Sequence, residues 1–397
     1  MPAVNIKPGI YWIGVNDRTT DLFEGLWPIT SEGVSYNAYV IDDEKKVLVD
    51  AAKDIKSDAL LDQIAEVFDP SLLDYVVVNH MEPDHTGVLR TLRRIAPKVT
   101  FLCTSRAVKM LESYYQVTDN VHAVEDGETL DLGVHQLQFH IAPMVHWPET
   151  MVTYETTQKV LFSCDAFGGY GALQGAIFDD QCTALDFYEK EALRYYANIV
   201  ALFPKPVLKA IEKLSGIPID VVAPSHGLLW RKNPGRIIEL YQKWANYALE
   251  GPEPGVTLLY GTMYGNTEKM VDAVASGVAR AGMPLNIFDV RHINVSYILP
   301  SVYTRSGVLI GAPTYEGELF PLMAHVLDML NRKRIQNRKL AYFGSFGWSG
   351  GARREIAQWA EKLKWELVEA WEYPGGSTYQ DLLKGEELGY NFAQSLK

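Results

Sequence analysis

The chain of 397 residues is too long for one ordinary hydrophobic core and has room for two domains of roughly 150–250 residues each. Its composition is that of a folded protein, with 47% hydrophobic and 22% charged residues and no biased or repeated tract. The formal net charge of −12 argues against a nucleic-acid partner, because binding a nucleic acid would need a basic face. An acidic surface keeps a soluble protein in solution, and it also fits docking to a basic partner.

The first residues predict a β-strand rather than a targeting segment. Residues 1–15 contain one lysine and no long apolar run before a small-residue cleavage site, so Gly9–Gly14 is expected to be a strand. No stretch approaches the ~18 to 20 apolar residues that span a bilayer. We therefore expect a cytoplasmic protein with no membrane segment.

The three cysteines, Cys103, Cys164 and Cys182, are odd in number and form no C-x-x-C pair. Neither a disulfide framework nor a thiolate metal site is expected, and a rubredoxin module, which needs four thiolates, does not lie within this sequence. We expect all three to be small buried hydrophobic side chains.

Residues before Asp165 alternate between short strands and helices. Strands are expected at Tyr39–Ile41, Val47–Asp50, Tyr75–Val78, Val99–Cys103 and Leu137–Ile141, and helices at Ala59–Val67 and Ser105–Tyr114.

The clearest boundary is at residues 251–255, where two glycines and two prolines are expected to continue neither a helix nor a strand. An amphipathic helix, Arg236–Leu249, precedes this segment, and an apolar strand, Val256–Tyr260, follows it. We therefore predict two domains, residues 1–251 and 255–397. Beyond the boundary, strand–helix units predict a parallel sheet wrapped by helices; they start near Val256, Leu285, Gly307, Lys339 and Glu366.

Four potential metal ligands stand within six residues, directly after the strand Tyr75–Val78: His80, Glu82, Asp84 and His85. Pro83 restricts the loop that carries them, so the ligands need little further ordering. Three more candidates each follow an apolar, strand-like run, and loops at one sheet edge would bring them to the same place. These are His146, Asp165 and His226.

The pattern H-x-E-x-D-H of residues 80–85 resembles the H-x-H-x-D-H signature of the metallo-β-lactamase fold family, with Glu82 in place of the second histidine. That substitution resembles the flavo-diiron branch of the family. A carboxylate in place of an imidazole makes a harder, more anionic pocket, which suits iron better than zinc. A bridging carboxylate and a hydroxide would also bring two ferrous ions near neutrality.

This resemblance implies a ligand for each position of a diiron site. His80, Glu82 and His146 would hold one iron, and Asp84, His85 and His226 the other, with Asp165 and an oxo or hydroxo ligand as bridges. Some family members leave the position of His85 uncoordinated, so whether His85 ligates iron stays open.

Two residues outside the ligand set also follow from the resemblance. Tyr195 resembles a family tyrosine that hydrogen-bonds a ligand bound at the irons, although core packing explains a helix tyrosine equally well. Glu24 stands where many family members have histidine. This departure puts in doubt any role in proton delivery or substrate selection carried over from that histidine.

Three loops after predicted strands of the second domain suit a flavin mononucleotide. The first opens a helix with hydroxyl groups and glycine, as a phosphate monoester requires, and has no G-x-G-x-x-G for a dinucleotide. It holds Thr262, Met263, Tyr264, Gly265, Asn266 and Thr267. The other two, at strand ends where doubly wound sheets bind ligands, hold Pro313, Thr314, Tyr315 and Gly317, and Ser345, Phe346, Gly347, Trp348, Ser349 and Gly350.

The first of these loops resembles the flavodoxin signature T-x-T-G-x-T, with Tyr264 in place of the middle threonine. In the other two, aromatic side chains would cover the isoalloxazine ring, and glycines would let the backbone approach it. FMN is therefore the expected cofactor of the second domain.

The resemblance covers essentially the whole chain. It implies an αββα metallo-β-lactamase-like sandwich followed by a flavodoxin-like, doubly wound parallel sheet. The implied activity is four-electron reduction of dioxygen to water, with electrons passing from a donor such as rubredoxin or reduced deazaflavin through FMN to the diiron site. By analogy, a head-to-tail homodimer or a homotetramer is expected.

Other functions remain open. Reduction of nitric oxide to nitrous oxide on the same site is the alternative, because those activities share ligands in this family. A zinc-dependent hydrolase with a vestigial flavodoxin domain is a second candidate, and an electron-transfer or binding module without turnover is a third.

Overall fold

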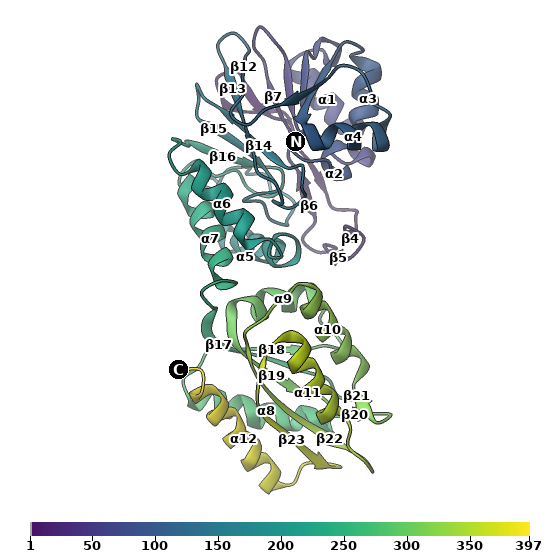
Figure 1. Ribbon diagram of the computed structural model, residues 1–397, viewed down its shortest axis with the longest axis vertical. Coiled ribbons are helices and arrows are strands. Elements are labelled where there is room, and N and C mark those ends of the chain that lie inside the picture. Colours follow the sequence, from purple (N-terminus) through teal and green to yellow (C-terminus); the bar gives the residue numbers. More distant parts are fainter. Residues whose placement is uncertain (1) are drawn as a thin grey trace. The chain divides into compact units, whose positions relative to one another are not determined.

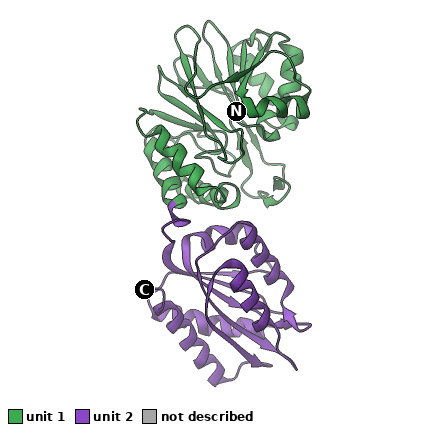
Figure 2. Cartoon of the chain, in the orientation of Figure 1, with its two compact units in different colours: residues 1–245 green, residues 246–397 purple. Residues whose placement is uncertain are grey.

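The structure is a computed structural model that describes residues 2–397. The chain divides into two compact units, residues 1–245 (unit 1) and residues 246–397 (unit 2), which Figure 2 distinguishes by colour. The domain boundaries expected from the sequence, 1–251 and 255–397, stay a prediction.

Unit 1 is built on two β-sheets. The seven-stranded sheet has the order β1 (Val4–Lys7), β2 (Ile10–Trp12), β7 (Tyr39–Ile41), β8 (Val47–Val49), β9 (Tyr75–Val77), β10 (Thr100–Thr104), β11 (Val121–Val124). The five-stranded sheet has the order β12 (Thr129–Asp131), β13 (Gln136–Ile141), β14 (Met151–Glu155), β15 (Val160–Cys164), β16 (Val221–Pro224).

Two short strand pairs complete the β-structure of unit 1. They are β3 (Val15–Asp17) with β6 (Val34–Tyr36), and β4 (Leu22–Phe23) with β5 (Trp27–Pro28).

The core of unit 1 lies between its two large sheets. Side chains alternate along a strand, so Val47 and Val49 of β8 enter this core, where they join Phe139 of β13 and Phe162 of β15. Leu48, which is also buried, points to the opposite face of its sheet.

Helices cover the outer faces of both sheets, so unit 1 has the expected αββα layers (Figure 1). The helices beside the first sheet are α1 (Ser57–Val67), α3 (Leu89–Ile95) and α4 (Ser105–Tyr115). Those beside the second sheet are α5 (Leu185–Tyr195), α6 (Pro204–Leu214) and α7 (Pro234–Tyr247). The short helix α2 (Pro83–Thr86) follows β9.

Unit 2 is a five-stranded parallel sheet, as the strand–helix rhythm predicted. Its order is β18 (Leu285–Asp289), β17 (Glu253–Tyr260), β19 (Arg305–Gly311), β22 (Lys339–Phe346), β23 (Glu366–Pro374). A two-stranded pair, β20 (Thr314–Tyr315) and β21 (Glu318–Leu319), lies beyond β19.

Helices flank this sheet. Buried residues of α8 (Asn266–Arg280) and α12 (Tyr379–Gln394) share one core with the strands, for example Val274 and Phe392 with Leu309. The remaining helices are α9 (Val295–Thr304), α10 (Pro321–Arg332) and α11 (Ala352–Leu363). The flavodoxin-like, doubly wound fold expected for this part of the chain is therefore confirmed.

The start of β17 differs from the sequence prediction. The strand begins at Glu253 and includes Pro254 and Gly255, a segment that was expected to form no strand. Glu253 pairs with Arg305 and Val256 with Gly307, and the register shifts between these two pairs. The irregularity takes up Pro254, which cannot donate a ladder hydrogen bond, so a strand that begins with a bulge tolerates it.

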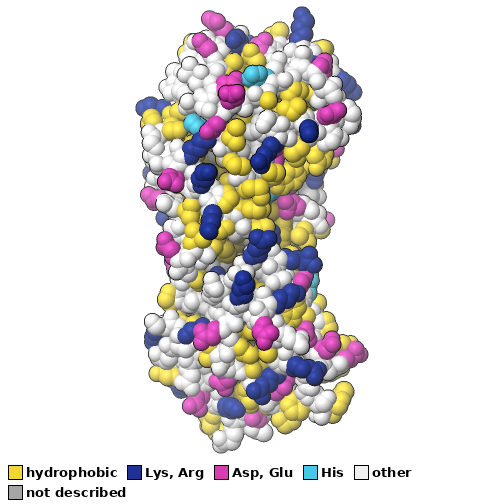
Figure 3. Space-filling view, in the orientation of Figure 1, with side chains coloured by type: hydrophobic (Ala, Val, Ile, Leu, Met, Phe, Trp, Pro, Cys, Tyr) yellow, Lys and Arg dark blue, Asp and Glu magenta, His cyan; other side chains and the backbone are white. Residues whose placement is uncertain are grey.

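None of the helices within residues 2–397 is both long and apolar enough to cross a membrane. On the face shown in Figure 3, charged side chains of both signs are scattered among hydrophobic ones.

Candidate metal and flavin sites

The seven predicted metal ligands lie on loops at the ends of strands and on the short helix α2. His80 and Glu82 lie between β9 and α2, and α2 itself supplies Asp84 and His85. Asp165 directly follows β15. His226 follows β16 by two residues, and His146 lies in the loop between β13 and β14. Both sheets of unit 1 therefore contribute side chains to one place.

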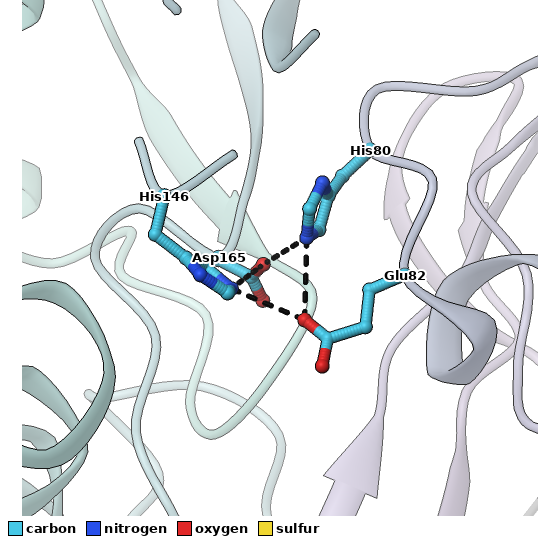
Figure 4. A group of neighbouring side chains, drawn as sticks. All are labelled: His80, Glu82, His146 and Asp165. Atoms are coloured by element: carbon cyan, nitrogen blue, oxygen red, sulfur yellow. Dashed lines mark hydrogen bonds and ion pairs between the residues drawn. The ribbon is translucent and has the colours of Figure 1, made fainter. Parts of the chain in front are cut away.

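The first group of potential ligands comprises His80, Glu82, His146 and Asp165, whose ligand atoms all lie within 4.8 Å of one another. Figure 4 shows the four side chains pointing toward a common centre. Oε2 of Glu82 lies 3.3 Å from Nε2 of His80 and 3.1 Å from Nε2 of His146. Both of these nitrogens lie 3.4 Å from Oδ2 of Asp165.

The second group comprises Asp84, His85 and His226, again within 4.8 Å of one another. Nε2 of His226 lies 3.3 Å from Oδ2 of Asp84. Oδ1 of Asp165 lies 3.1 Å from Nε2 of His85 and 3.3 Å from Nε2 of His226. The two oxygens of Asp165 thus face different groups, which is the arrangement that a bridging carboxylate requires.

Buried polar atoms in this cluster test whether it fits metal ions. Both carboxylate oxygens of Asp84, Oδ2 of Asp165, and Nε2 of His85 and of His226 are buried and have no hydrogen-bond partner. Buried polar atoms normally have partners, because desolvating them unpaired costs free energy. Two cations coordinated by these atoms would satisfy all of them, and the mixture of imidazole and carboxylate ligands fits iron.

The pKa shifts of the histidines and carboxylates show that this cluster favours positive charge. Burial lowers the pKa values of His146 and His226, but interactions with carboxylates, above all Asp165, outweigh burial and raise these values to about 9 and about 10. Burial raises the pKa of Asp165, yet the charge on His85 and the close contacts with the neighbouring imidazoles hold this pKa well below its ordinary value. The carboxylates thus favour positive charge among the histidines, which metal ions would supply.

Cys164 lies within the same cluster, because its sulfur groups with ligand atoms of His85 and Asp165. Burial and the nearby Asp50 raise the pKa of the Cys164 thiol well above its ordinary value, so the sulfur is a thiol rather than a thiolate ligand. All three cysteines are free; Cys103 and Cys164 are buried as expected, whereas Cys182 is half-buried.

The hydroxyl of Tyr195 donates a 2.8 Å hydrogen bond to Oδ1 of Asp165. Burial raises the pKa of Tyr195 well above its ordinary value, so the phenol keeps its proton. Tyr195 is the last residue of α5, and the chain continues into a π-helical turn, Tyr196–Val200. π-Helical turns are rare in proteins, and those that occur are often found at functional sites.

Glu24 lies at the turn of the β4–β5 hairpin, exposed and with a positive φ of 51°. Its Oε2 accepts a 2.9 Å hydrogen bond from Nε1 of Trp27. The neighbouring Phe23 packs edge-on against His226, with ring centroids 5.4 Å apart, and Tyr36 contacts the same ring at 5.8 Å. The sequence analysis missed Phe23 and Tyr36, because no pattern separates such rings from ordinary core aromatics.

Glu149 is the most informative residue that the sequence analysis missed. It is 1% exposed, and its Oε1 accepts hydrogen bonds from Nδ1 of His80 at 2.7 Å and from the backbone N–H of Met81 at 2.9 Å. A signal was available, since Glu149 follows His146 by three residues in the same loop between strands. Sequence alone did not say whether that carboxylate turns inward.

The predicted phosphate loop of unit 2 connects β17 to α8. Gly265, with a φ of 89°, stands at the helix N-terminus, and its N–H donates to Oγ1 of Thr262 at 3.0 Å. Oγ1 of Thr267 is buried and has no hydrogen-bond partner. An unsatisfied hydroxyl beside the free N–H groups of a helix N-terminus fits the phosphate of FMN.

The other two loops follow β19, which pairs with β17, and β22, which pairs with β19. The three strands are parallel, so all three loops leave the same edge of the sheet. A Cβ atom on Gly351 would lie 1.9 Å from the carbonyl oxygen of Gly317, so the second and third loops pass in close contact. Large aromatic side chains are exposed on all three loops: Tyr264 is 91% exposed, Tyr315 41% and Trp348 92%. Exposed aromatic rings on loops that also contain glycine suit the binding of a flat, hydrophobic ring.

The remaining predicted flavin residues lie on the same three loops or in the elements that adjoin them. Met263 lies in the first loop and Asn266 is the first residue of α8; Pro313 lies in the second loop and Thr314 in β20; Ser345 and Phe346 are the last residues of β22, and Gly347, Ser349 and Gly350 follow in the third loop.

Comparisons with known proteins agree with both halves of this description. The family described as ODP family beta lactamase matches residues 34–227, and the flavodoxin family matches residues 258–390. A nitric oxide reductase of Moorella thermoacetica is 37% identical over 388 residues, which cover 97% of this chain and 95% of that protein.

Two solved structures share the fold over nearly the whole chain. The rubredoxin oxygen:oxidoreductase of Desulfovibrio gigas matches with a TM-score of 0.93 and 30% identity, covering 99% of this chain and 98% of the other. The flavodiiron protein of Giardia intestinalis matches with a TM-score of 0.94 and 28% identity, covering 100% and 97%.

A β-lactamase-like unit with two clusters of candidate metal ligands, joined to a flavodoxin-like unit, defines an oxidoreductase that combines a flavin with a dinuclear metal site. The extent and identity of the matches are specific. The chain belongs to the flavo-diiron protein family.

Proposed function

We propose that this protein reduces dioxygen to water with electrons relayed through FMN to a non-haem diiron site. The observation that supports this most directly is the division of seven metal-binding side chains into two groups that share Asp165. When bound, two ferrous ions and one reduced FMN supply the four electrons that dioxygen requires.

The ligands divide as the two groups do. His80, Glu82 and His146 would hold one iron, and Asp84, His85 and His226 the other, with Asp165 between them and an oxo or hydroxo ligand as a second bridge. His85 belongs to this set because both nitrogens of its buried ring lack hydrogen-bond partners. A cation is the simplest partner for its Nε2.

Other residues of unit 1 would hold a proton and exclude water. The phenol of Tyr195 keeps its proton and holds Asp165 in place through its hydrogen bond. The aromatic rings of Phe23 and Tyr36 pack edge-on against His226 and would exclude water from it. Glu24, held by Trp27, would set the position of the hairpin that carries Phe23 rather than deliver a proton.

In unit 2, Thr262–Thr267 would bind the FMN phosphate, with Thr267 as a hydrogen-bond donor. Tyr315 and Trp348 would cover the isoalloxazine ring. The domain limits 1–251 and 255–397 are part of this proposal, as are a rubredoxin or reduced deazaflavin donor, a head-to-tail homodimer or homotetramer, and a location in the cytoplasm.

Reduction of nitric oxide to nitrous oxide is the second candidate. The name of the Moorella thermoacetica relative supports it, whereas the name of the Desulfovibrio gigas structure supports dioxygen. The same ligands would serve either gas, so the two activities differ in the residues around the site.

The first test is the metal and flavin content of anaerobically purified protein. Two irons and one FMN per chain are expected. Zinc without iron would favour the hydrolase candidate, and a single metal or none would favour an electron-transfer or binding module.

A further inference from the structure

The two metal-binding groups differ in what lies behind their histidines. In the first group, Nδ1 of His80 is 2.7 Å from Oε1 of Glu149, a fully buried carboxylate. In the second group, Nδ1 of His226 donates at 2.7 Å to the backbone carbonyl of Ser35, a neutral acceptor, and Nδ1 of His85 has no hydrogen-bond partner, although the buried carboxylate of Asp50 lies near that ring. Within residues 2–397, the hydrogen bond from His80 to Glu149 is therefore the one in which a carboxylate accepts from the outer nitrogen of an imidazole of these two groups.

The hydrogen bonds of Glu149 define the tautomer of His80. Oε1 of Glu149 also accepts from the backbone N–H of Met81, so this oxygen is an acceptor. Nδ1 of His80 must then be the donor, which leaves the lone pair of a neutral ring on Nε2. Nε2 is the atom that faces Glu82 and Asp165, so the ring presents a ligand atom to the centre of the first group.

The structure also fixes Glu149 in place. The hydroxyl of Thr104, at the end of β10, donates a 2.7 Å hydrogen bond to the carbonyl oxygen of Glu149. Oε2 of the carboxylate is buried and has no partner, so no second donor draws charge away from the His80 side.

We propose that Glu149 is a positioning residue that makes the two metal positions unequal. It holds His80 with Nε2 free for metal, and its charge makes this imidazole a stronger donor. The position of His80, Glu82 and His146 therefore binds iron more tightly, and favours the oxidised ion more, than the position of Asp84, His85 and His226. This inference rests on the proposed diiron function.

Glu149→Gln is the decisive variant, because glutamine keeps an acceptor oxygen and the side-chain shape but removes the charge. The matched control is Glu155→Gln, at another buried carboxylate at the end of β14, whose Oε1 lies 3.0 Å from Nδ1 of His135, the residue before β13. Thr104→Val is a milder second variant that removes only the anchor of the Glu149 backbone. All are made in the full-length chain, with FMN content and circular dichroism as checks of folding.

Ferrous ions alone are the probe, titrated anaerobically into chelator-treated protein, followed by a potentiometric titration of the metal-loaded protein. In Glu149→Gln we expect one of the two irons to bind about 10- to 100-fold more weakly, and its reduction potential to rise. Thr104→Val should shift the same iron by a smaller factor, and Glu155→Gln should match the unmodified protein.

Two irons bound at unmodified affinity and potential in Glu149→Gln would overturn the inference while leaving the diiron function intact. Weakening of both irons to the same degree would also overturn it. If Glu149→Gln does not fold, unchanged iron binding in Thr104→Val decides against it. If the unmodified protein itself does not bind two irons, the proposed function fails, and this inference fails with it.

Discussion

Asp165 and Tyr195 form a pair in which a buried phenol donates a 2.8 Å hydrogen bond to the carboxylate shared by both metal-binding groups. The donor lies on α5 and the acceptor at the end of β15, so this bond joins an outer helix to the centre of the site. Because Oδ1 faces the second group and Oδ2 the first, the orientation of one side chain fixes the spacing of both groups.

Replacement of Asp165 by alanine should remove most of the iron. Four imidazoles lie within ion-pair distance of the Asp165 carboxylate. Without this carboxylate, no side chain would connect the two groups. The flavin loops belong to unit 2, so FMN should remain at one per chain. Metal analysis and the flavin absorbance of purified Asp165→Ala measure both quantities. Retention of two irons would refute the bridging role.

Tyr195→Phe should destabilise metal-free protein by about 1.5–3 kcal/mol, since it removes a hydrogen bond to a charged acceptor. Tyr241→Phe is the matched control, because the Tyr241 hydroxyl donates at the same 2.8 Å distance to a neutral acceptor, the carbonyl oxygen of Gly168. That variant should lose only about 0.5–1.5 kcal/mol. The free energies of unfolding come from denaturant titrations; equal losses would show that the charge on Asp165 contributes nothing to this contact.

Thr267→Val should weaken the binding of FMN by about tenfold or more, because a hydroxyl that serves a phosphate is worth about 1.5–3 kcal/mol. Riboflavin, which lacks the phosphate, should bind the variant and the unmodified protein equally well. Ser306→Ala is the control, because it also removes a buried hydroxyl that has no hydrogen-bond partner. Ser306 lies at the start of β19, whereas a predicted flavin loop follows the end of this strand. Flavin fluorescence titrations of apoprotein measure both affinities. An equal loss for riboflavin would mean that Thr267 acts on folding rather than on the phosphate.

Stability should depend on pH through Asp17, a buried carboxylate remote in sequence from the metal ligands. Burial raises its pKa, but hydrogen bonds from Thr19 and Thr20 and the charge of Lys56 outweigh this and lower the pKa far below the ordinary value. The unfolded chain takes up the proton first as the pH falls through about 4. The stabilising contribution is therefore complete above that pH and is lost progressively below it.

Asp17→Asn tests this dependence. The variant should be less stable than the unmodified protein at neutral pH, and the difference in free energy of unfolding should narrow as the pH falls below about 4. Urea titrations between neutral and acidic pH measure the difference. A gap that stays constant over this range would show that Asp17 is not ionised preferentially in the folded protein.

Much of the candidate site could be predicted from the sequence, because its residues are either close together in the chain or directly follow the ends of strands. Residues 80–85 lie on one short loop and helix, so their spacing alone places four candidate ligands together. Asp165 and His226 follow the parallel strands β15 and β16, whose ends lie at the same sheet edge. Such placements need only the strand assignments and the direction of each strand.

Other features depend on contacts that no local pattern encodes. Glu149 reaches His80 across a sequence separation of 69 residues, and the inward turn of its side chain is a property of the folded loop. Pro254 lies in β17 because the partner strand β19 tolerates a shift of register, which the composition of residues 251–255 did not reveal. Phe23 likewise contacts His226 only because the β4–β5 hairpin folds over it.

The most direct test of the central claim is gas consumption by anaerobically purified, iron- and FMN-loaded protein that is reduced with an artificial one-electron donor. Dioxygen and nitric oxide are followed on electrodes in parallel, with an assay for hydrogen peroxide. Rapid dioxygen uptake without peroxide, and slower loss of nitric oxide, is the expected result. The reverse ratio would make nitric oxide the substrate, and failure to consume either gas would contradict the function proposed for this protein.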